Sequence, residues 1–351
     1  MPHPTSAGAG LLVDGCTRGS VARRVARFGY IGGRLSLSEK ALIEAIRRRT
    51  KRLPGVLLGI GDDCSILRIP SGHEALVTTD FSLEGVHFRR DWHSPEVIGH
   101  RCLTRGLSDI AAMGGTPIAA FLSLAVPSNV KSSWVKRFVS GLLRLAERFQ
   151  VTLAGGDTAQ SPAGVLADIL VLGSVPIGKA VLRSGARAGD CMYVTGKLGG
   201  AAATLDLLRG GRKLRSDDYP EHFHPMPRVE VGSALRGIAS AMIDISDGLS
   251  IDSAHICEES GVGAEILADA LPRARTGKPS REVDLRYALH GGDDYELLFT
   301  APSRRKVPKT IAGVPITRIG CVIRRQRMFL LGSDGSRTVL QARGWQHFRK
   351  S

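Results

Sequence analysis

Cysteine is scarce in this chain, and the spacing that would hold a zinc ion or a disulfide framework is missing. The six cysteines lie far apart, with no CxxC pair and no histidine at zinc-ligand spacing. They are Cys16, Cys64, Cys102, Cys191, Cys257 and Cys321. This usage is typical of a reducing compartment, where thiols serve as small core side chains, so we expect a cytoplasmic protein.

Aromatic residues are also few, at 5% of the 351 residues, so stacking platforms for single-stranded nucleic acid are not evident. Acidic residues number 33 against 48 basic ones, which gives a formal net charge of +15. Such an excess fits a nucleic-acid partner, an anionic substrate or a basic surface without a partner. Because the basic residues are scattered and form only small clusters, we expect no dedicated nucleic-acid partner.

The signatures of two large nucleotide-binding classes are absent. The chain has no GxxxxGK[ST] loop, no HRDxxxxN loop and no GxGxxG loop, so it is predicted to be neither a P-loop enzyme nor a protein kinase. Residues 191–208 do have the order strand, glycine-rich turn and helix, in which backbone amides at a helix start can hold an anion. Lys197 in that turn lacks the spacing of a Walker lysine.

A membrane-spanning run is missing as well. No charged residue occurs from Ala111 to Val130, but a Gly-Gly-Thr-Pro sequence interrupts this run and Pro127 ends it. We interpret it as a helix end followed by a buried strand at 118–126, and predict no membrane partner. Residues 1–33 lack the apolar region of a secretory signal, and we expect a disordered or misannotated extension there.

The rest of the chain alternates between strand-like and helix-like segments in both halves. Helical patterns cover 95–113 and 134–149, and an apolar strand at 165–178 closes the first half. In the second half, 241–261 and 288–302 join strands to acidic turns, whereas the polar, proline-rich stretch 209–228 is predicted to be a flexible loop. The class is therefore α/β or α+β with two domains, at 34–178 and 179–351.

One carboxylate, Asp109, lies in a segment that otherwise has the composition of a protein core. Leu107 and Ile110 flank it, and burying an isolated carboxylate costs several kcal/mol, roughly, unless it is paired, protonated or bound to a cation. Arg105 lies four residues earlier, one helical turn away, so an internal salt bridge is one interpretation. A bound metal ion is the other.

The metal interpretation gains weight because acidic residues recur at glycine-flanked turns and strand ends. These residues are Asp62, Asp63, Asp80, Asp109, Asp157, Asp244, Asp247, Asp293 and Asp294. A single aspartate of this kind is usually a turn or cap residue, but several carboxylates brought together cannot all remain ionised without cations. Oxygen ligands without histidine or cysteine favour magnesium or calcium over zinc, and magnesium is common at phosphate-transfer sites.

Seven ordered motifs carry a resemblance to a known family. They are GIGDDC, TTD followed by LEGVHF, LSDIAAMGG, GGDT followed by SP, RSGARAGD, DISDGL and GGDDYELLF. In this order they closely resemble the thiamine-monophosphate kinase family, within the superfamily of aminoimidazole-ribonucleotide synthetase-like ATP enzymes. The resemblance covers about residues 36 to 348.

The resemblance implies a fold and a site. The fold would be an N-terminal domain whose sheet pairs with that of a dimer mate in a barrel, and a C-terminal α/β domain, with ATP between them. The implied magnesium ligands are Asp63, Thr78, Thr79, Asp80, Asp109, Asp157, Asp244 and Asp247. The implied nucleotide contacts are Gly156, Asp157, Arg183 and Ser246, and the implied thiamine phosphate contacts are His87, Asp293 and Trp345. Of these, Asp109, Asp157 and Asp247 are the implied catalytic residues.

The chain departs from the family pattern at two motif positions. Gly106 stands where the family usually has asparagine, and Asp293 stands where it usually has glutamate. We expect the carboxylate of Asp293 to face the positively charged thiamine moiety or a polar group on it, not the transferring phosphoryl group, and Asp294 to be structural. Taken without the family, His87 could be an interior imidazole, and Trp345 could be a packing residue of the C-terminal segment.

The resemblance thus implies ATP-dependent phosphorylation of thiamine phosphate to thiamine diphosphate, by direct in-line transfer assisted by several Mg²⁺ ions, in a homodimer. The acceptor is itself anionic, so no general base is required. Two alternatives remain at this point: another ATP-dependent synthetase of the same superfamily, or a basic nucleic-acid-binding protein on a degenerate kinase fold.

Overall fold

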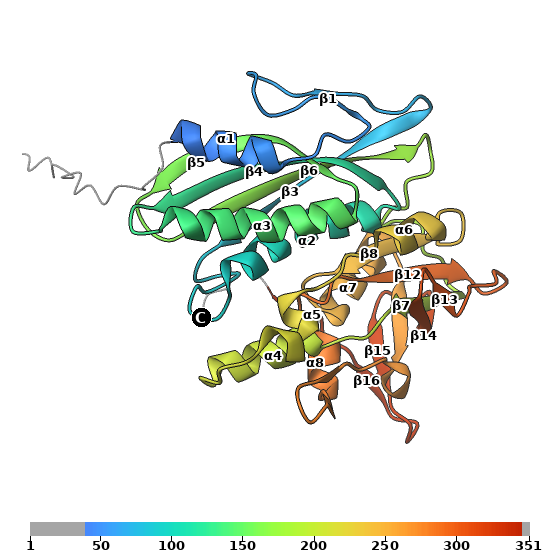
Figure 1. Cartoon of the computed structure of the whole chain (residues 1–351). Helices are drawn as coiled ribbons and strands as arrows, with labels where there is room; N and C mark the ends of the chain where they lie inside the picture. Colours follow the sequence, from blue (N-terminus) through green and yellow to red (C-terminus); the bar gives the residue numbers. More distant parts are fainter. Residues whose placement is uncertain (1–38, 346–351) are drawn as a thin grey trace, which may run out of the picture. The chain divides into compact units, whose positions relative to one another are not determined.

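A computed structural model describes residues 39–345 (Figure 1), which lie within one compact unit at 34–351. The extension predicted at 1–33 lies outside the described residues. The elements of the first half are α1 (Glu39–Arg49), β1 (Val56–Leu58), β2 (Ile66–Leu67), β3 (His73–Leu83), α2 (Pro95–Ala112), β4 (Thr116–Pro127), α3 (Ser132–Arg148), β5 (Thr152–Ser161) and β6 (Leu166–Pro176).

The second half begins with β7 and again alternates strands with helices. Its helices are α4 (Gly200–Arg209), α5 (Pro220–Phe223), α6 (Val229–Leu235), α7 (Leu249–Ser260) and α8 (Leu285–His290), with short 3₁₀ turns at Ser216–Asp218 and Ala268–Ala270. Its strands are β7 (Asp190–Thr195), β8 (Ala241–Ile245), β9 (Gly263–Leu267), β10 (Arg275–Thr276), β11 (Arg281–Glu282), β12 (Glu296–Pro302), β13 (Thr310–Ile311), β14 (Val314–Ile323), β15 (Met328–Leu331) and β16 (Arg337–Val339).

The first half is built on a four-stranded sheet in the order β3-β6-β4-β5. Strands β3, β6 and β4 pair antiparallel, and β4 pairs parallel with β5. Successive side chains of a strand point to opposite faces of the sheet. Leu122, Leu124, Ile169 and Val171 therefore share one face, where they are buried against α2 and α3. We call this the inner face, and the opposite one the outer face.

Helix α2 is the element on which the site is organised. Its start is defined by Ser94, whose hydroxyl accepts a hydrogen bond from the amide of Val97, and by Pro95 at the first helical position. It ends where Gly114 adopts a positive φ of 68°. One side of α2 contacts β3 and β6, and other parts contact α6 and β8, so a single helix joins the two halves (Figure 1).

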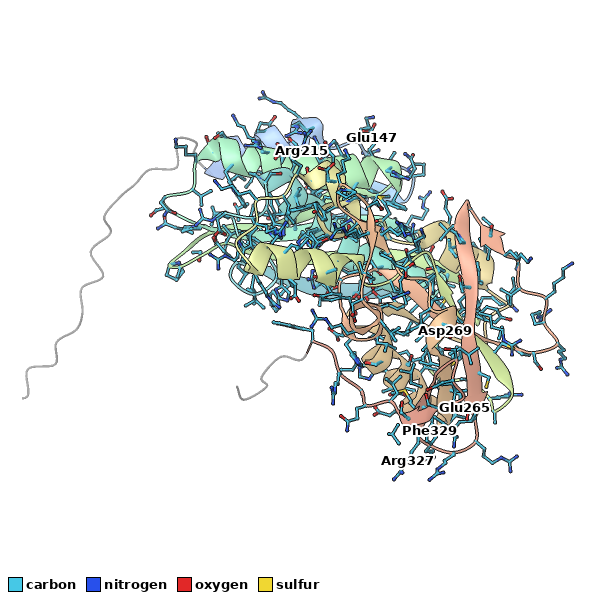
Figure 2. All side chains as sticks on the ribbon, turned by 90° about the horizontal axis from the view of Figure 1, so that it is seen from below. Glu147, Arg215, Glu265, Asp269, Arg327 and Phe329 are labelled. Atoms are coloured by element: carbon cyan, nitrogen blue, oxygen red, sulfur yellow. The ribbon has the colours of Figure 1, made fainter. Side chains whose placement is uncertain are left out.

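The second half contains an eight-stranded mixed sheet. Its strand order is β16-β15-β9-β14-β7-β12-β8, and β13 pairs with β14 outside this order. Helix α7 packs on β8, β9 and α8. At the far edge, the Arg337 guanidinium lies 3.6 Å from the centroid of the Phe329 ring and pairs with Glu265, a region labelled in Figure 2. The mixed α/β class is confirmed, and the sheets of the described residues are open, with no barrel within the chain.

One local prediction is wrong. The stretch 209–228 was expected to be a flexible loop, but it contains α5, whose His222 and Phe223 are each only 2% exposed. The helix is too short for a periodic pattern to reveal it, and tertiary contacts with the segment around His93 hold it in place.

The uncharged run from Ala111 forms the end of α2 and β4, and within residues 39–345 no helix is long and apolar enough to cross a membrane.

Candidate active site

The centre of the candidate site is Asp109, in the last turns of α2 on the inner side of the sheet. Its carboxylate accepts a hydrogen bond from the hydroxyl of Thr78 on β3. Burial raises the pKa of Asp109 above its ordinary value. The salt bridge with Arg105, one of the two interpretations of the sequence, is not the arrangement found, because Arg105 pairs with Asp293, with 3.3 Å between Nη2 and Oδ1.

Two further carboxylates gather around Asp109. Asp80 shares the inner face of β3 with Thr78, and burial together with repulsion from Asp109 raises the pKa of Asp80 to about 7. Asp244 at β8 is 4% exposed and accepts a hydrogen bond of 2.7 Å from Ser108, and burial and Asp109 raise the pKa of Asp244 to about 7. We call Asp80, Asp109 and Asp244 the inner carboxylates.

The turn after β8 places the predicted Ser246 and Asp247 in the cavity that the inner carboxylates line. Its conformation is held by Asp252 of α7, whose carboxylate accepts from the amides of Asp247 at 3.2 Å and Gly248 at 3.0 Å. Burial, followed by repulsion from nearby carboxylates, raises the pKa of Asp252 to about 8. Asp252 was not identified from the sequence, although it follows the DISDGL motif within one helical turn.

The chemistry of the inner carboxylates fits a divalent cation. They come from three elements and carry only oxygen donors, and burial followed by repulsion from Asp109 raises the pKa values of Asp80 and Asp244. Within residues 39–345, the side chains do not converge into a preformed group of three or more metal-binding residues. The structure therefore brings the acidic residues into one neighbourhood without arranging them in a coordination sphere.

Other predicted ligands lie on the outer face of the sheet. Thr79 follows Thr78 and so points the opposite way, where its hydroxyl donates to Asp168 at 2.6 Å. Asp157 on β5 is opposite Ser123 of β4, which is itself paired with Asp168 on β6. Both Thr79 and Asp157 are exposed. A single chain thus places these two residues across the sheet from the inner carboxylates.

A second cavity, of about 500 Å³, lies beside Asp157 and is also lined by Asp63 and Gly156. Gly156 has φ of 144°, and a side chain there would meet the carbonyl oxygen of Leu122 at 1.9 Å, so only glycine fits. The neighbouring Thr158 hydroxyl is buried with no hydrogen-bond partner among the described residues. We call Asp63, Gly156 and Asp157 the outer group.

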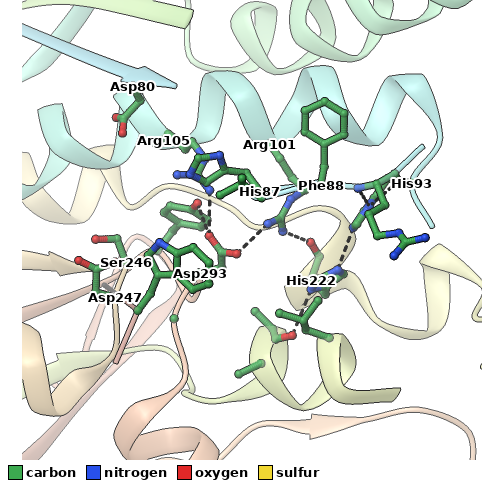
Figure 3. A pocket seen from close by; sticks show the side chains of 18 of the residues that line it. Asp80, His87, Phe88, His93, Arg101, Arg105, His222, Ser246, Asp247 and Asp293 are labelled. Carbon is green, nitrogen blue, oxygen red and sulfur yellow. Dashed lines mark hydrogen bonds and ion pairs between the residues drawn. The ribbon is translucent and has the colours of Figure 1, made fainter. Parts of the chain in front are cut away.

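The three residues predicted to hold thiamine phosphate line the same cavity as the inner carboxylates, with a volume of about 600 Å³ (Figure 3). His87, Asp293 and Trp345 come from segments far apart in sequence. The ring of His87 accepts a hydrogen bond at Nδ1 from the amide of Leu83, 3.0 Å away. Trp345 is 43% exposed, and its backbone amide donates to the carbonyl oxygen of Asp247 at 3.2 Å.

Asp293 is the most constrained of the three. Its Oδ1 accepts from the hydroxyl of Tyr295 at 2.6 Å, and its Oδ2 accepts from Arg101 at 2.9 Å. Burial alone raises the pKa of Asp293, but the charges of Arg101 and Arg105 outweigh it and hold the pKa well below its ordinary value. Asp293 also has φ of 64°, a strained conformation for a residue with a side chain. Its expected contact with thiamine therefore competes with two guanidinium groups.

Arg101 and a histidine pair were missed in the sequence. The Arg101 side chain is 5% exposed and donates to the carbonyl oxygen of His222, while His222 and His93 approach to 3.0 Å between their Nε2 atoms (Figure 3). Burial lowers the pKa of His93 to about 4 and that of His222 well below its ordinary value, so both rings are neutral at pH 7. The sequence does contain a signal for Arg101: it lies four residues before Arg105, so the two arginines share one side of α2.

In the glycine-rich turn at 196–199, the amides of Gly196, Leu198 and Gly199 already donate to acceptors within the protein. The amide of Gly199, just before α4, donates to the carboxylate of Asp294 at 2.7 Å. Asp294 therefore has a structural role, because its carboxylate binds the backbone at the start of α4.

Arg183 is exposed and does not line the larger cavity, but its charge lowers the pKa values of Asp109 and Asp244 against the effect of burial.

The chain is similar to known proteins over most of its length. Residues 61–175 match the N-terminal domain of AIR synthase related proteins, and residues 187–331 match the C-terminal domain. The thiamine-monophosphate kinase of Salmonella typhimurium is 38% identical over 86% of this chain and 95% of its own.

Two solved structures are also similar. The thiamine-monophosphate kinase of Stenotrophomonas maltophilia has 34% identity and a TM-score of 0.74, over 86% of this chain and 98% of its own. A structure described as AaThiL complexed with AMPPCP and TMP has 33% identity and a TM-score of 0.71, over 89% of this chain and 97% of its own.

Proposed function

This chain belongs to the thiamine-monophosphate kinase family, and from that premise we propose that it transfers a phosphoryl group from ATP to thiamine phosphate. It is accordingly an enzyme, a phosphotransferase whose acceptor is a phosphate group. The observation that carries the proposal is the larger cavity. There the predicted substrate residues His87, Asp293 and Trp345 adjoin the inner carboxylates.

The acceptor group determines what the chain has to do. A phosphate oxygen is already anionic at neutral pH, because its second pKa is about 6, so no protein base is required. The remaining requirement is to hold two polyanions together and in line. His87 and Trp345 hold the thiamine phosphate, and Ser246 with Arg183 holds the nucleotide.

The inner carboxylates and Asp247 hold magnesium in this proposal, with Thr78 hydrogen-bonded to Asp109. When bound, Mg²⁺ supplies the positive charge that offsets the phosphate groups of both substrates. The inner carboxylates are suited to this role because Asp244 is buried, Asp80 and Asp109 are half-buried, and repulsion from Asp109 adds to the effect of burial on the other two. Asp109 and Asp247 act there as the catalytic carboxylates.

We also propose a homodimer in which the outer faces of two sheets pack together. Val77 and Phe81 on the outer face of β3 are 63% and 56% exposed, an apolar surface on an edge strand. Such packing covers these side chains and would close the sheets into the predicted barrel. It also gives the outer group and Thr79 a partner surface, so that Asp63, Asp157 and Gly156 contribute ligands and nucleotide contacts at the dimer interface.

The five cysteines described are free thiols, four of them at least partly buried, which supports a reducing, cytoplasmic location.

The decisive experiment incubates the protein with ATP, magnesium and thiamine phosphate and measures thiamine diphosphate and ADP. Equal amounts of the two products are expected, and Asp109→Asn is the control. Formation of ADP without thiamine diphosphate would show that thiamine phosphate is not the acceptor.

A further inference from the structure

Arg105 lies in the larger cavity but belongs to none of the motifs that carry the family resemblance. It precedes the LSDIAAMGG segment on α2, and its side chain is 15% exposed. In Figure 3 its guanidinium lies between Asp80 on one side and Asp293 on the other, next to His87. It therefore stands where the carboxylate cluster and the substrate residues meet.

The two arginines of α2 are used differently. Arg101 is nearly inaccessible, and its two terminal nitrogens donate to the carbonyl oxygen of His222 and to Asp293. Within residues 39–345, Arg105 has a single side-chain hydrogen bond, to Asp293 at 3.3 Å. A guanidinium carries five N–H donors, so most of those on Arg105 remain for a ligand in the cavity.

The electrostatic surroundings of Arg105 define which ligand fits. Arg105 faces the carboxylate of Asp293 at 3.3 Å and lines the same cavity as Asp80 and Asp109. A cation so placed repels the positively charged ring of thiamine and attracts a phosphate. The planar fork of arginine also matches two phosphate oxygens, which a lysine cannot do.

We propose that Arg105 binds the phosphate of the acceptor and that Asp293 is a positioning residue that holds Arg105 in place. This inference rests on the proposed function, and it reassigns the contact expected between Asp293 and thiamine. Two oxygens of Asp293 already accept three hydrogen bonds, from Arg101, Arg105 and Tyr295. The aspartate at 293 thus binds the two arginines, and Arg105 binds the phosphate of the substrate.

The test separates the phosphate from the rest of the substrate. Binding of thiamine phosphate and of thiamine, which lacks the phosphate, is measured by calorimetry for the wild type, Arg105→Gln and Arg105→Lys. Arg105→Gln is expected to weaken thiamine phosphate binding roughly 10- to 100-fold, the range of one charge-assisted hydrogen bond, and to leave thiamine binding unchanged. Arg105→Lys should fall between, since it keeps the charge and loses the fork.

Arg209 is the matched control, since it lines the same cavity but is 57% exposed and faces Asp206 at 3.8 Å. Arg209→Gln should leave both affinities unchanged. Equal weakening of thiamine and thiamine phosphate by Arg105→Gln would overturn the proposal and make Arg105 a structural bridge between α2 and Asp293. Unchanged affinity for both would overturn it too.

Two further outcomes separate this inference from the proposed function. If the wild type forms thiamine diphosphate while Arg105→Gln keeps its preference for the phosphorylated ligand, only the role of Arg105 is wrong. If the wild type neither binds nor converts thiamine phosphate, the proposed function and the proposed role of Arg105 are both wrong. Should Arg105→Gln fail to fold, which its melting temperature will show, Arg105→Lys decides: it supports the proposal only if the loss is confined to thiamine phosphate.

Discussion

The two faces of the sheet β3-β6-β4-β5 carry acidic residues under different physical conditions. On the inner face Asp80 is half-buried beside Asp109 and Asp244, and repulsion among these carboxylates contributes to their raised pKa values. On the outer face Asp157 is exposed, and Thr79 donates to Asp168. The inner carboxylates are already gathered in one cavity within a single chain, whereas in the proposed dimer the outer group needs a second surface to become a site.

This difference arises from a shift of one residue along a strand. Thr78 and Thr79 are adjacent, yet Thr78 faces Asp109 and Thr79 faces away from it. A motif such as TTD therefore distributes its side chains over two faces. Whether the two faces serve one site depends on how a second chain packs, and the following experiments test that comparison.

The largest effect is expected at the inner face. Asp109→Asn should lower turnover roughly a thousandfold, because it removes one charge from the proposed magnesium site. Steady-state kinetics measure the loss, and magnesium should raise the melting temperature of the wild type more than that of the variant. Full activity in Asp109→Asn would show that this carboxylate has only a structural role.

The second prediction joins the two faces in one experiment. If the outer group of one chain completes the inner site of its partner, Asp109→Asn and Asp157→Asn should each be inactive alone. Mixed after dissociation and reassociation, they should regain about a quarter of wild-type activity, because half of the dimers are mixed and each has one intact site.

The control for this mixing is Phe81→Glu, which places a charge on the exposed outer face of β3. It should yield a monomer by light scattering and abolish the recovery in mixtures. Active monomers would show that the outer face is not required, and recovery without dimers would contradict the shared site.

The third prediction concerns pH. The folded-state pKa values of Asp80 and Asp244 are raised from the ordinary 3.8 to about 7, so their protonated forms favour the folded protein. Their contribution to the free energy of unfolding is therefore fully present below about pH 4 and is lost as the pH rises to about 7. Denaturant titrations without magnesium should show this decline.

Asp80→Asn should flatten the decline between pH 4 and 7, and Asp157→Asn, on the exposed outer face, should not. Saturating magnesium should restore stability to the wild type at pH 7, because it binds the ionised carboxylates. An equal pH dependence in both variants would mean that the two faces do not differ in this respect.

The smallest effect is expected at His87, which lies in the cavity but is not needed as a base. His87→Gln should raise the Michaelis constant for thiamine phosphate by up to about tenfold and leave the maximal rate within a similar factor. General acid–base catalysis typically contributes a hundredfold or more. A thousandfold fall in the maximal rate at saturating substrate would assign His87 to the chemistry.

The class and the main elements of the fold were predictable because their signals are local. The helix at 95–113 and the strand at 118–126 agree with α2 and β4 to within two residues at each end, since Pro95, Gly114 and Pro127 mark their boundaries. The short helix α5 was not predictable, because it has too few residues for a period. The division into two domains at residue 178 remains a prediction.

The amino-acid sequence by itself determined the family and the candidate residues, because the acidic turns, the ordered motifs and the absence of a P-loop motif can all be read along the chain. The tertiary structure alone decided which of them meet. Arg105 lies one helical turn from Asp109, yet it pairs with Asp293, 188 residues away. Long-range ion pairs and the choice of sheet face depend on how β3, α2 and the turn before β12 pack. Sequence spacing cannot specify that packing, because burial and desolvation act only on the folded chain.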